Sequence, residues 1–574
     1  MARLSAYGLL LATASAFALP GVAHAQSLAY GDVSQGADEP SDGSSSSGGS
    51  SSRRSRGSDK PPPTRTRDIT PYIEVAQVVR AELSPQDEVL TYTKVAAGVD
   101  SVLAGRNSAA AVSVRYERNF SWQDSRGDED YISGIARGVV SLSPGVSIQA
   151  GGLATRFNID DQGRAVDGAV AVQDTVSQVY SVYAGPSVQA QAGDVAIDAH
   201  YRIGYTEVDN TNGFAVDDQG KAFDQFDNSV VHVASVTAGV KPDTVLPVGV
   251  GVGGTYYRED VNELDQRVED GEVHAIVTVP VAQSLAVTGA VGYETVEISH
   301  RDAVRDADGD PIVGSDGNYV SDKSQPRLLA YDVDGLTWDA GVIWRPSRRT
   351  SLTAHVGRRY GTTSYDAVLT YAPSTRSALA VVVYDNIAGF GGQINRALAD
   401  LPTDFTAIRN PITGDISGCV SSLESGNCLN GSLGSLRSST FRARGVAASY
   451  TQKFGRIKAG LGAGYDRRRF IAAEGTVLEA FNGLIDEKYW LTGYLDAELG
   501  QNAGFSAYLY ANWIESGGTL GGEANSLGAY GSYYHRLTNH ISARATVGID
   551  GYDTNDLTED IWTMSGLVGV KYSF

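Results

Sequence analysis

The stretch Ile561–Phe574, IWTMSGLVGVKYSF, decides the fold that we predict for this chain. In an extended strand, one face of this stretch carries Phe574, Tyr572, Val570, Val568, Met564 and Trp562. The other face is small or polar, with Leu567 as its one apolar residue. This period of two is typical of a strand between lipid and a wet interior, and equally of an edge strand in a soluble β-sandwich. Aromatic residues at both ends of the apolar face favour the membrane, because such residues form girdles at the two interfaces.

The same stretch resembles the C-terminus of bacterial outer-membrane β-barrels. In that superfamily a terminal Phe, an aromatic residue two positions earlier and alternating apolar residues upstream form the signal read by the barrel-assembly machinery. Phe574, Tyr572 and Val570 stand at these positions here. The resemblance implies a barrel in the outer membrane of a Gram-negative cell. It also implies the assembly machinery, outer-membrane lipid and lipopolysaccharide as partners.

The alternation recurs along the chain, with charged side chains on one face of each segment. Segments with this pattern include residues 112–117, 195–205, 352–357 and 457–465. Charges confined to one face are costly in a soluble core and natural for the polar lumen of a barrel. The side chains that the pattern predicts to line the lumen are Arg115, Glu117, Asp198, His200, Arg202, His355, Lys458 and Lys571.

Short turns alternate with long polar loops between the predicted strands. The turns lie at residues 143–145, 191–194, 241–246, 281–284, 346–350, 373–377 and 454–456. The long loops lie at residues 123–130, 158–175, 209–227, 259–271, 299–326 and 390–439. We therefore predict an all-β fold, a single large closed antiparallel transmembrane β-barrel of about 22 strands, within a range of roughly 18–24. An even number places both ends of the barrel on the same side of the membrane.

Composition agrees with this architecture and excludes other classes. The 574 residues include 66 Gly and 30 Tyr but only 2 Met and 2 Cys, which suits many strands with tight turns. A formal charge of -21 excludes nucleic acid as a partner, because no basic face offsets phosphate repulsion. The mean hydropathy of -0.18 argues against a helical membrane protein, as does the lack of an apolar run of about 18 residues beyond the N-terminus.

Two N-terminal segments are expected to precede the barrel. Residues 1–25 are predicted to be a secretory signal peptide, with Arg3 at the positive start and Ala23-His24-Ala25 at the cleavage site. Residues 26–69 are rich in Gly, Ser, Pro and Arg, and predict a disordered periplasmic tether. The barrel is expected over residues 70–574.

The longest predicted loop, residues 390–439, leaves alternatives open. It could fold inward and narrow the lumen, which we favour, or stand outside as a surface lobe. Its two cysteines, Cys419 and Cys428, could form a disulfide in an oxidising compartment. A metal site on these cysteines is less favoured, because no His or further Cys lies nearby in the sequence.

A second loop offers a weak candidate for calcium. Asp306, Asp308 and Asp310 stand at alternate positions around a glycine, as in the first half of a calcium-binding loop. The acidic residue expected further on is not clearly placed, so a plain turn is the favoured interpretation. No other metal or cofactor is predicted.

No catalytic motif is present in the sequence. It contains no G-x-S-x-G, H-E-x-x-H, P-loop or C-x-x-C pattern, and its eight His residues are scattered. We therefore expect that the chain is not an enzyme.

Arginines gather in four short segments. These are residues 345–349, 358–359, 442–444 and 467–469. They could form an anion-attracting stripe along one wall of the lumen. The favoured interpretation is that they meet lipopolysaccharide phosphate at the rim or balance Asp and Glu across the lumen.

A second resemblance concerns the start of the predicted barrel. Residues 70–77 (TPYIEVAQ), 87–93 (DEVLTYT) and 97–100 (AGVD) are similar to a family of proteobacterial outer-membrane barrels, some of them encoded beside exopolysaccharide export genes. The resemblance implies a porin-like channel for passive passage of small hydrophilic solutes, or for polysaccharide export. The alternative is a non-conducting surface barrel, an adhesin or an anchor for an exopolysaccharide matrix.

Overall fold

The computed structural model describes most of the chain from Thr66 onward. The described residues are 66–85, 87–123, 127–159, 165–166, 176–210, 226–314, 318–421, 427–429, 436–517, 522–554 and 560–574. The predicted signal peptide and most of the predicted tether lie outside them. The first strand begins at Thr66 rather than at residue 70, so the last residues assigned to the tether belong to the barrel.

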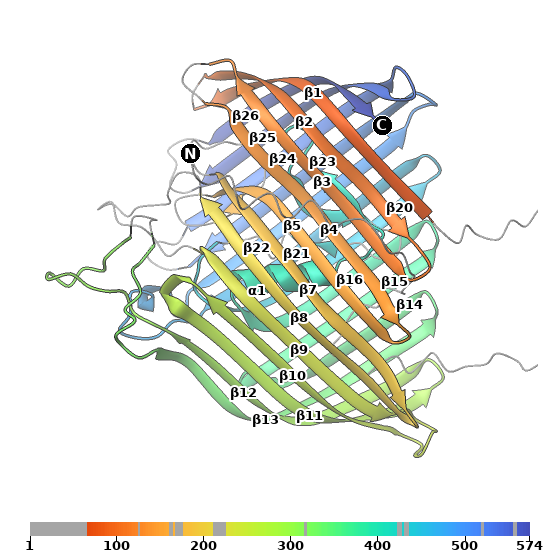
Figure 1. Ribbon diagram of the computed structural model, residues 1–574, viewed down its shortest axis with the longest axis vertical. Helices are drawn as coiled ribbons and strands as arrows, with labels where there is room; N and C mark the ends of the chain where they lie inside the picture. The colour runs from red at the N-terminus through yellow and green to blue at the C-terminus, as the bar shows by residue number, and fades with distance from the viewer. Residues whose placement is uncertain are drawn as a thin grey trace, which may run out of the picture.

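The described chain forms a closed antiparallel barrel (Figure 1). Its main sheet contains 23 described strands, of which the two-residue β6 (Ala165–Val166) pairs only with β5. The other 22 form a ring, as predicted. Each ring strand pairs with the next one along the chain, and β1 pairs with β26 to close the ring, with Tyr72 opposite Ser573. Closure leaves no strand of the ring at an open edge of the sheet, which is required where lipid surrounds the backbone.

The bounds of the ring strands are as follows. They are β1 (Thr66–Ser84), β2 (Val89–Ala104), β3 (Ser108–Ser121), β4 (Glu129–Ser143), β5 (Val146–Ile159), β7 (Val176–Ala192), β8 (Val195–Asn210), β9 (Asn228–Val240), β10 (Gly249–Val261), β11 (Gln266–Ala282), β12 (Leu285–His300), β13 (Leu328–Ser347), β14 (Thr350–Arg359), β15 (Thr362–Ser374), β16 (Ser377–Ala388), β20 (Phe441–Phe454), β21 (Ile457–Phe470), β22 (Ile485–Glu498), β23 (Ala503–Ser516), β24 (Gly522–Arg536), β25 (Ile541–Thr554) and β26 (Ile561–Ser573).

The two ends of the barrel differ in their connections. One end, which we call the turn end, has short connections at all seven positions where turns were predicted. The other, the loop end, carries the longer connections, including residues 301–327 between β12 and β13. Two 3-10 helices also lie at the loop end, η2 (Glu263–Asp265) and η3 (Glu479–Phe481).

One predicted loop is wrong. Residues 259–271 are not a long loop, because β10 continues to Val261 and β11 begins at Gln266. The polar side chains that suggested a loop form ion pairs across this hairpin instead. Asp260 binds Arg267 at 2.7 Å and Arg258 binds Glu269 at 3.2 Å across the hairpin, while Asp260 also binds Arg258 on its own strand at 2.6 Å. The pairs let the two strands extend toward the loop end with a charged outward face.

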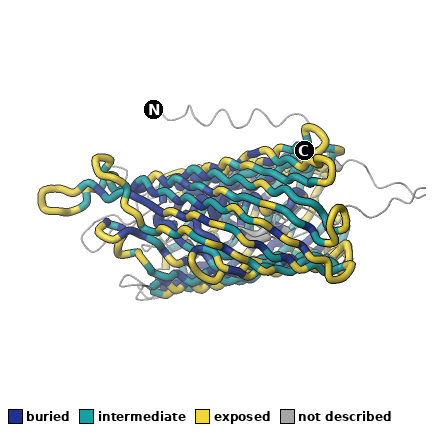
Figure 2. The backbone as a smooth tube through the Cα atoms, turned by 90° about the horizontal axis from the view of Figure 1, so that it is seen from below, coloured by how far each residue is buried: buried dark blue, intermediate teal, exposed yellow. Residues whose placement is uncertain are grey.

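The outward face of the barrel is apolar along its middle and aromatic near both ends. Val252, Val273, Val291, Leu336 and Val568 are each more than 60% exposed on this face. Figure 2 shows that exposed and less exposed residues alternate along the strands. Exposed aromatic residues gather in two groups: Trp344, Tyr371, Tyr450, Phe505, Tyr533 and Tyr572 toward the turn end, and Tyr116, Tyr205, Tyr256, Tyr293, Tyr489 and Trp513 toward the loop end.

The spacing of the two aromatic groups fits a lipid bilayer. On β23, Phe505 and Trp513 are eight residues apart, or about 27 Å along the strand at about 3.4 Å per residue. A strand tilted by about 40° then spans about 21 Å along the membrane normal, a little less than the apolar band of roughly 25 Å that is typical of outer-membrane barrels. The sequence-based expectation for β26 also holds, since Val568, Val570 and Tyr572 lie on its exposed face.

The longest loop folds into the barrel, as the favoured prediction stated. Residues 389–440, which we call the plug, contain α1 (Phe390–Ala399), β17 (Thr406–Arg409), β18 (Ile416–Ser421) and β19 (Asn427–Cys428). Figure 1 shows α1 enclosed by the ring, where it contacts β5, β7, β8, β9 and β16. The hairpin of β17 and β18 contacts β3, β4 and β5. No helix in the described part of the chain is both long and apolar enough to cross a membrane.

The outward position of Val568 on β26 can be tested by substitution. We expect Val568→Arg to lower the free energy of unfolding by about 2–4 kcal/mol, because the residue lies near the middle of β26 and faces lipid. Urea titration of the barrel in lipid vesicles would measure the loss. Val568→Ile is the matched control and should change stability little. Equal stability of the arginine variant and the control would contradict a lipid-facing position.

Candidate functional site

The interior of the barrel, as far as the structure describes it, has two parts. The plug packs mainly against β3–β5 and β7–β9, whereas a polar chamber is lined by residues of β10–β15. The plug fills one part of the lumen, and the chamber is the polar cavity in the other part. We describe the plug first and the chamber second.

A carboxylate of the wall caps the N-terminus of α1. Glu259 on β10 is fully buried, and it accepts hydrogen bonds from the backbone N–H groups of Gly389 at 2.6 Å and Gly392 at 2.9 Å. The Ser229 hydroxyl and the Tyr257 hydroxyl donate to the same carboxylate at 3.0 and 2.5 Å. The first turn of a helix has unpaired N–H groups and a partial positive charge, and a carboxylate satisfies both. The wall thus supplies the cap that Gly389 cannot.

Glycines at the start of α1 allow this close approach. A Cβ on Gly391 would lie 2.0 Å from the Ser229 hydroxyl oxygen, and a Cβ on Gly392 would lie 1.9 Å from the Tyr257 hydroxyl oxygen. Two glycines in the first turn weaken the intrinsic preference for helix. Their presence is explained by the distance between helix and wall, which leaves no space for a side chain.

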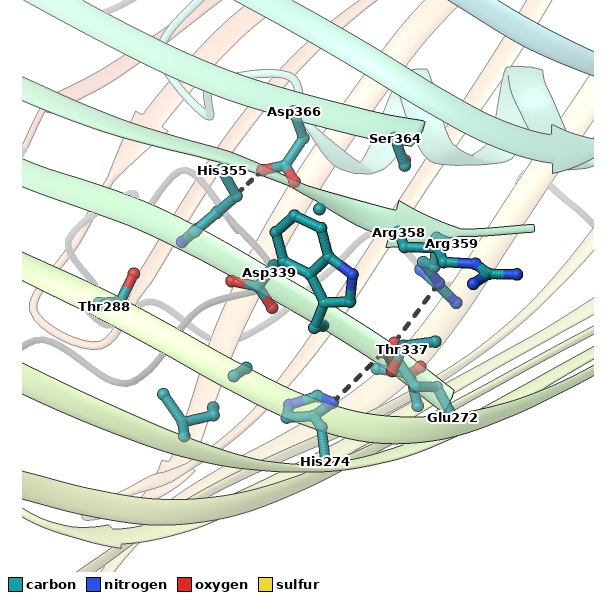
Figure 3. A pocket seen from close by; sticks show the side chains of 15 residues that line it. Glu272, His274, Thr288, Thr337, Asp339, His355, Arg358, Arg359, Ser364 and Asp366 are labelled. Atoms are coloured by element: carbon teal, nitrogen blue, oxygen red, sulfur yellow. Dashed lines mark hydrogen bonds and ion pairs between the residues drawn. The ribbon is translucent and has the colours of Figure 1, made fainter. Parts of the chain in front are cut away.

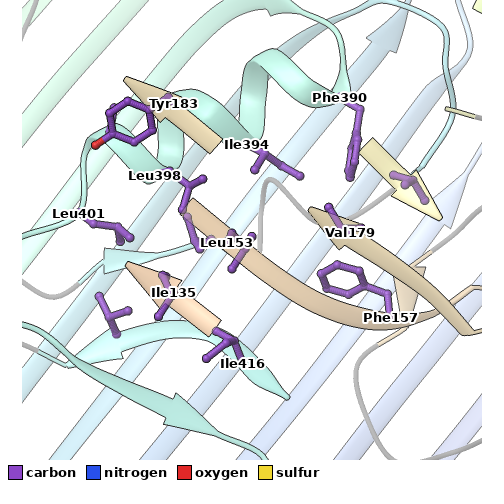
Figure 4. Packing of buried hydrophobic residues seen from close by; sticks show 14 of the residues in the cluster. Ile135, Leu153, Phe157, Val179, Tyr183, Phe390, Ile394, Leu398, Leu401 and Ile416 are labelled. Carbon is purple, nitrogen blue, oxygen red and sulfur yellow. The ribbon is translucent and has the colours of Figure 1, made fainter. Parts of the chain in front are cut away.

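A hydrophobic core lies inside the barrel, between α1 and the wall (Figure 4). Phe390, Ile394 and Leu398 recur at every fourth position and form one face of the helix. They pack against inward side chains of the wall, including Ile135 and Leu153. The full cluster is Ala111, Ile135, Leu153, Phe157, Val179, Tyr183, Val208, Phe226, Val261, Phe390, Ile394, Leu398, Ala399, Leu401, Phe405, Ile416, Val420, Leu429 and Leu436. The expectation of a polar lumen is wrong on this side, where the inward face is apolar because the plug covers it.

Cations from the wall bind the tip of the β17–β18 hairpin. Lys94 on β2 donates to the Ile412 carbonyl at 2.5 Å. Arg156 on β5 donates to the Thr413 carbonyl at 2.8 Å and pairs with Asp415 at 2.7 Å. These bonds satisfy backbone carbonyls of a tight turn that is enclosed by protein, where unpaired polar groups are costly.

Two wall glutamates form ion pairs with Lys94, with Arg156 and with a third cation, Arg115 on β3. Glu117 binds Lys94 at 3.2 Å, Arg115 at 3.1 Å and Arg156 at 3.1 Å, while Glu74 binds Arg115 at 2.9 Å. The group is almost entirely buried. Removal of one partner would leave an uncompensated buried charge, so the network specifies a single position for the hairpin tip.

The inward apolar residue of the C-terminal strand belongs to the plug interface as well. Leu567 is 2% exposed and packs in a cluster with Ile412 at the hairpin tip and with Tyr508 and Tyr530 of the wall. The one exception to the alternation in residues 561–574 is therefore explained by contact with the plug.

The chamber lies on the side of the lumen that the plug leaves uncovered (Figure 3). Its lining includes the titratable side chains Glu272 and His274 on β11, Asp339 on β13, His355 on β14 and Asp366 on β15. His355 and Asp366 form a hydrogen bond at 3.1 Å. The other lining residues are Thr255, Ile276, Thr288, Ala290, Thr337, Trp338, Gly357, Arg358, Arg359 and Ser364.

One arginine organises the carboxylates next to the chamber. Arg359 binds Asp270 at 3.0 Å and lies 3.5 Å from both Glu272 and Glu294. A single guanidinium thus faces three carboxylates. With Asp339 and Asp366 added, this part of the lumen has an excess of negative charge.

All eight predicted lumen-lining residues lie on inward strand faces, but in different settings. His355 lines the chamber, whereas Arg115 and Glu117 are buried in the ion-pair network beneath the plug. Lys458 is on β21, and Lys571 on β26 lies with its ammonium 3.6 Å from the centre of the Tyr72 ring.

The other three candidates follow one another on β8. Asp198, His200 and Arg202 alternate with Tyr201 and Ile203, which are exposed on the outward face. Asp198 accepts a hydrogen bond from Gln189 at 3.1 Å, and His200 bonds to Ser235 at 2.8 Å. The structure does not bring the eight residues together into one site.

The calcium candidate is a backbone turn. Asp306 uses one carboxylate oxygen to accept the backbone N–H groups of Asp308 at 2.9 Å and Asp310 at 3.0 Å. Gly309 follows with a positive φ of 91°. Within the described residues no group of three or more His, Cys, Asp or Glu side chains could hold a metal ion.

The two cysteines lie in the plug. Cys419 on β18 stands opposite Cys428 on β19 in the strand register. The disulfide remains a prediction, because the side chains of both residues lie outside the described part of the structure.

The residue that sequence reasoning missed is Glu259. It was assigned to an outer loop, although its alternation with Tyr257 on the inward face indicates a continuing strand. The run Gly389-Phe390-Gly391-Gly392 and the apolar inward residues of β4, β5 and β7 were also available signals. None of them indicates by itself which loop covers which part of the wall.

Comparison with known proteins finds similarity only among solved structures. No family model matches this sequence, and no curated protein sequence matches it. The open form of the ferric-catecholate import receptor Fiu from E. coli K12 is 9% identical, with 88% of this chain and 81% of that chain covered and a TM-score of 0.43. The siderophore receptor PirA from Acinetobacter baumannii is 9% identical, with 89% and 81% covered and a TM-score of 0.40. The FrpB iron transporter from Neisseria meningitidis (F5-1 variant) is 11% identical, with 88% and 83% covered and a TM-score of 0.38. Similarity at this level carries no information about what this chain binds.

Capping by Glu259 can be tested by hydrogen exchange. We expect Glu259→Ala to leave N–H groups of α1 without partners and to destabilise the docked helix by about 1–3 kcal/mol. Mass spectrometry of peptides that cover residues 389–400 should then show faster exchange, with the ring strands unchanged. Glu269→Ala, on the outward face of the neighbouring strand, is the control. Unchanged exchange in α1 would contradict the cap.

The fit of α1 against the wall can be tested at Gly392. We expect Gly392→Ala to displace the start of the helix, because its Cβ would overlap the Tyr257 hydroxyl. The cost should be about 1–3 kcal/mol, as for other overpacked sites, despite the better helix propensity of Ala. The same exchange experiment measures it, and Gly566→Ala, which has open space around it, serves as control. Slower exchange of α1 in the Gly392 variant would show that the space is available.

Proposed function

We propose that this chain is an outer-membrane channel that passes small hydrophilic solutes between its own plug and the wall formed by β10–β15. The observation that carries the proposal is the polar chamber next to the plug, with titratable side chains from four strands, β11 and β13–β15, around one cavity. A barrel that served only as an anchor would not need such a lining. The plug would then set the width of the passage, and the chamber its selectivity.

The apolar outer surface supports the location. The two groups of exposed aromatic residues and the apolar band between them are typical of a barrel in a bilayer. The alternation of short turns and longer loops supports an outer membrane, with the loop end toward the exterior.

The charge of the chamber supports a preference for cations and neutral polar solutes. Asp339 and Asp366 point into it, and Arg359 is already shared by three carboxylates. Carboxylate rings in a narrow passage attract cations and repel anions. Hydroxyl, imidazole and carboxylate groups together also suit hydrogen bonding to a polyhydroxylated solute.

The plug disfavours passage of a wide polymer in the conformation described. Its hydrophobic core and buried ion pairs hold it against one side of the wall, so polysaccharide export would require its release. The same contacts favour a second candidate, a non-conducting surface barrel that uses the plug to close its lumen. Conductance separates the two.

Single-channel recording in planar bilayers tests the proposal. We expect small conductance steps from the wild-type chain and a reversal potential in a potassium chloride gradient that shows cation preference. Asp339→Asn combined with Asp366→Asn should move the reversal potential toward zero. Asp334→Asn, on the outward face of the same strand as Asp339, is the matched control and should leave it unchanged.

A variant with a loosened plug provides the internal check. Glu259→Ala should raise the single-channel conductance or the open probability of the channel, because the substitution weakens the docking of α1. Silence from the wild-type chain and from this variant, with correctly folded barrels, would overturn the channel and leave the non-conducting barrel.

A further inference from the structure

Four arginines form a compact block on the outward face of the barrel near the loop end. Arg442 and Arg444 lie on β20, and Arg469 and Arg467 stand directly opposite them on β21. They share the outward face with Val446 and Leu461 of the same strands, which are exposed. The block therefore faces the surroundings of the barrel and not its lumen.

The barrel itself gives no reason to place these charges opposite one another. Like charges at directly opposed positions destabilise a pair of strands. The next strands supply two carboxylates, Asp385 opposite Arg444 and Glu487 opposite Arg467. Four arginines against two carboxylates leave an excess of two positive charges.

The two carboxylates orient the arginines without occupying all their donors. Asp385 has a fully buried side chain and binds Arg442 at 2.7 Å and Arg444 at 3.1 Å. Glu487 lies 3.6 Å from Arg467. Within the described residues Arg469 has no ion-pair partner, and it is exposed. The arrangement holds guanidinium groups in place with N–H donors still available.

The block surrounds a cavity. Its lining consists of the four arginines and two hydroxyl residues of β15, Thr362 and Thr363, and its volume is about 280 Å³. The cavity exists because β15 pairs with β16 only from Ala367 onward, so its first residues lie apart from β16. Arg442 and Arg444 reach across this gap and donate to the Thr363 carbonyl at 3.4 and 2.8 Å.

The cavity lies at the height of lipid headgroups. Toward the middle of the membrane the outward face continues with Tyr465 and Tyr489, whose rings are 4.9 Å apart, and then with Leu461, which is 51% exposed. Aromatic residues mark the level of the interface, so the arginines lie just beyond it, on the side of the loop end.

We propose that this cavity binds the phosphate groups of a phosphorylated glycolipid in the leaflet at the loop end. Guanidinium forks match phosphate oxygens in geometry, and charge-assisted bonds of this kind are the strong ones. The Thr363 hydroxyl adds a neutral donor for the sugar or for a further phosphate oxygen, whereas the Thr362 hydroxyl accepts from Arg442 at 2.6 Å and donates to the Thr363 carbonyl at 3.5 Å. The site depends on the orientation of the barrel in the membrane and not on whether the lumen conducts.

Native mass spectrometry of the full chain in detergent tests the site. The probes are a bis-phosphorylated lipid A, the same glycolipid after removal of both phosphates, and inorganic phosphate. We expect the phosphorylated lipid to bind the wild-type chain, and Arg467→Ala combined with Arg469→Ala to weaken that binding about tenfold, the loss expected for one or two charge-assisted bonds. These two arginines are chosen because they leave the buried Asp385 paired.

The control variant carries the same loss of charge at the other end of the barrel. Arg348→Ala combined with Arg349→Ala removes two exposed arginines from the turn between β13 and β14 and should leave binding unchanged. Resistance of the folded barrel to unfolding in detergent confirms that both variants are intact.

Two results would overturn the site. Equal affinity of the dephosphorylated glycolipid would show that phosphate is not recognised, and equal affinity of the two arginine variants would place the binding elsewhere. Displacement of the lipid by millimolar inorganic phosphate would show a site for free phosphate, and would overturn the assignment to lipid. The variant with Arg467→Lys and Arg469→Lys keeps both positive charges. If it binds the phosphorylated lipid more weakly than the wild-type chain but more tightly than the double alanine variant, the result would support recognition by the guanidinium fork.

Discussion

The structure depends on the constraint that backbone N–H and C=O groups next to lipid have no water to bind. Every strand of the ring meets this constraint by pairing on both sides, and β1 and β26 meet it by pairing with each other. Once the ring is closed, the outward face needs only apolar and interfacial side chains. The inward face is then free to be apolar, charged or water-lined in different sectors.

The plug covers the sector of the inward face that is apolar. A loop of about 50 residues could not stay ordered in water without burying apolar surface. Here it buries Phe390, Ile394 and Leu398 against aliphatic side chains of β4 and β5, inside a barrel whose lipid-facing surface is apolar as well. The wall thus has apolar residues on both faces in this sector, which is unlike a water-filled porin wall. The sector formed by β10–β15 keeps the polar inward face and forms the chamber.

Polar contacts determine where the plug lies, and apolar contacts provide most of its stability. Each apolar side chain buried between plug and wall contributes about 1.5–3 kcal/mol, but burial has little directional preference. Glu259 at the start of α1 and the cations at the hairpin tip are directional and costly to leave unpaired. They therefore select one docked position among the many that would bury similar area. In the arginine block outside the barrel, four arginines meet only two carboxylates of the neighbouring strands, so the fold balances their charge only in part.

The sequence by itself determined the barrel, a count of about 22 strands, its short turns and the outward face of the strands whose alternation is clearest, such as β8, β21 and β26. These features depend on a local period of two and on short connections between strands that are neighbours in the chain. Only the tertiary structure decided what fills the lumen. The Glu259 carboxylate and the Gly389 amide are 130 residues apart, and one hydrophobic cluster contains both Leu567 of the last strand and Ile412 of the plug. Such contacts join segments whose separation in the chain gives no local signal, because the closed ring, and not the neighbouring sequence, brings them together.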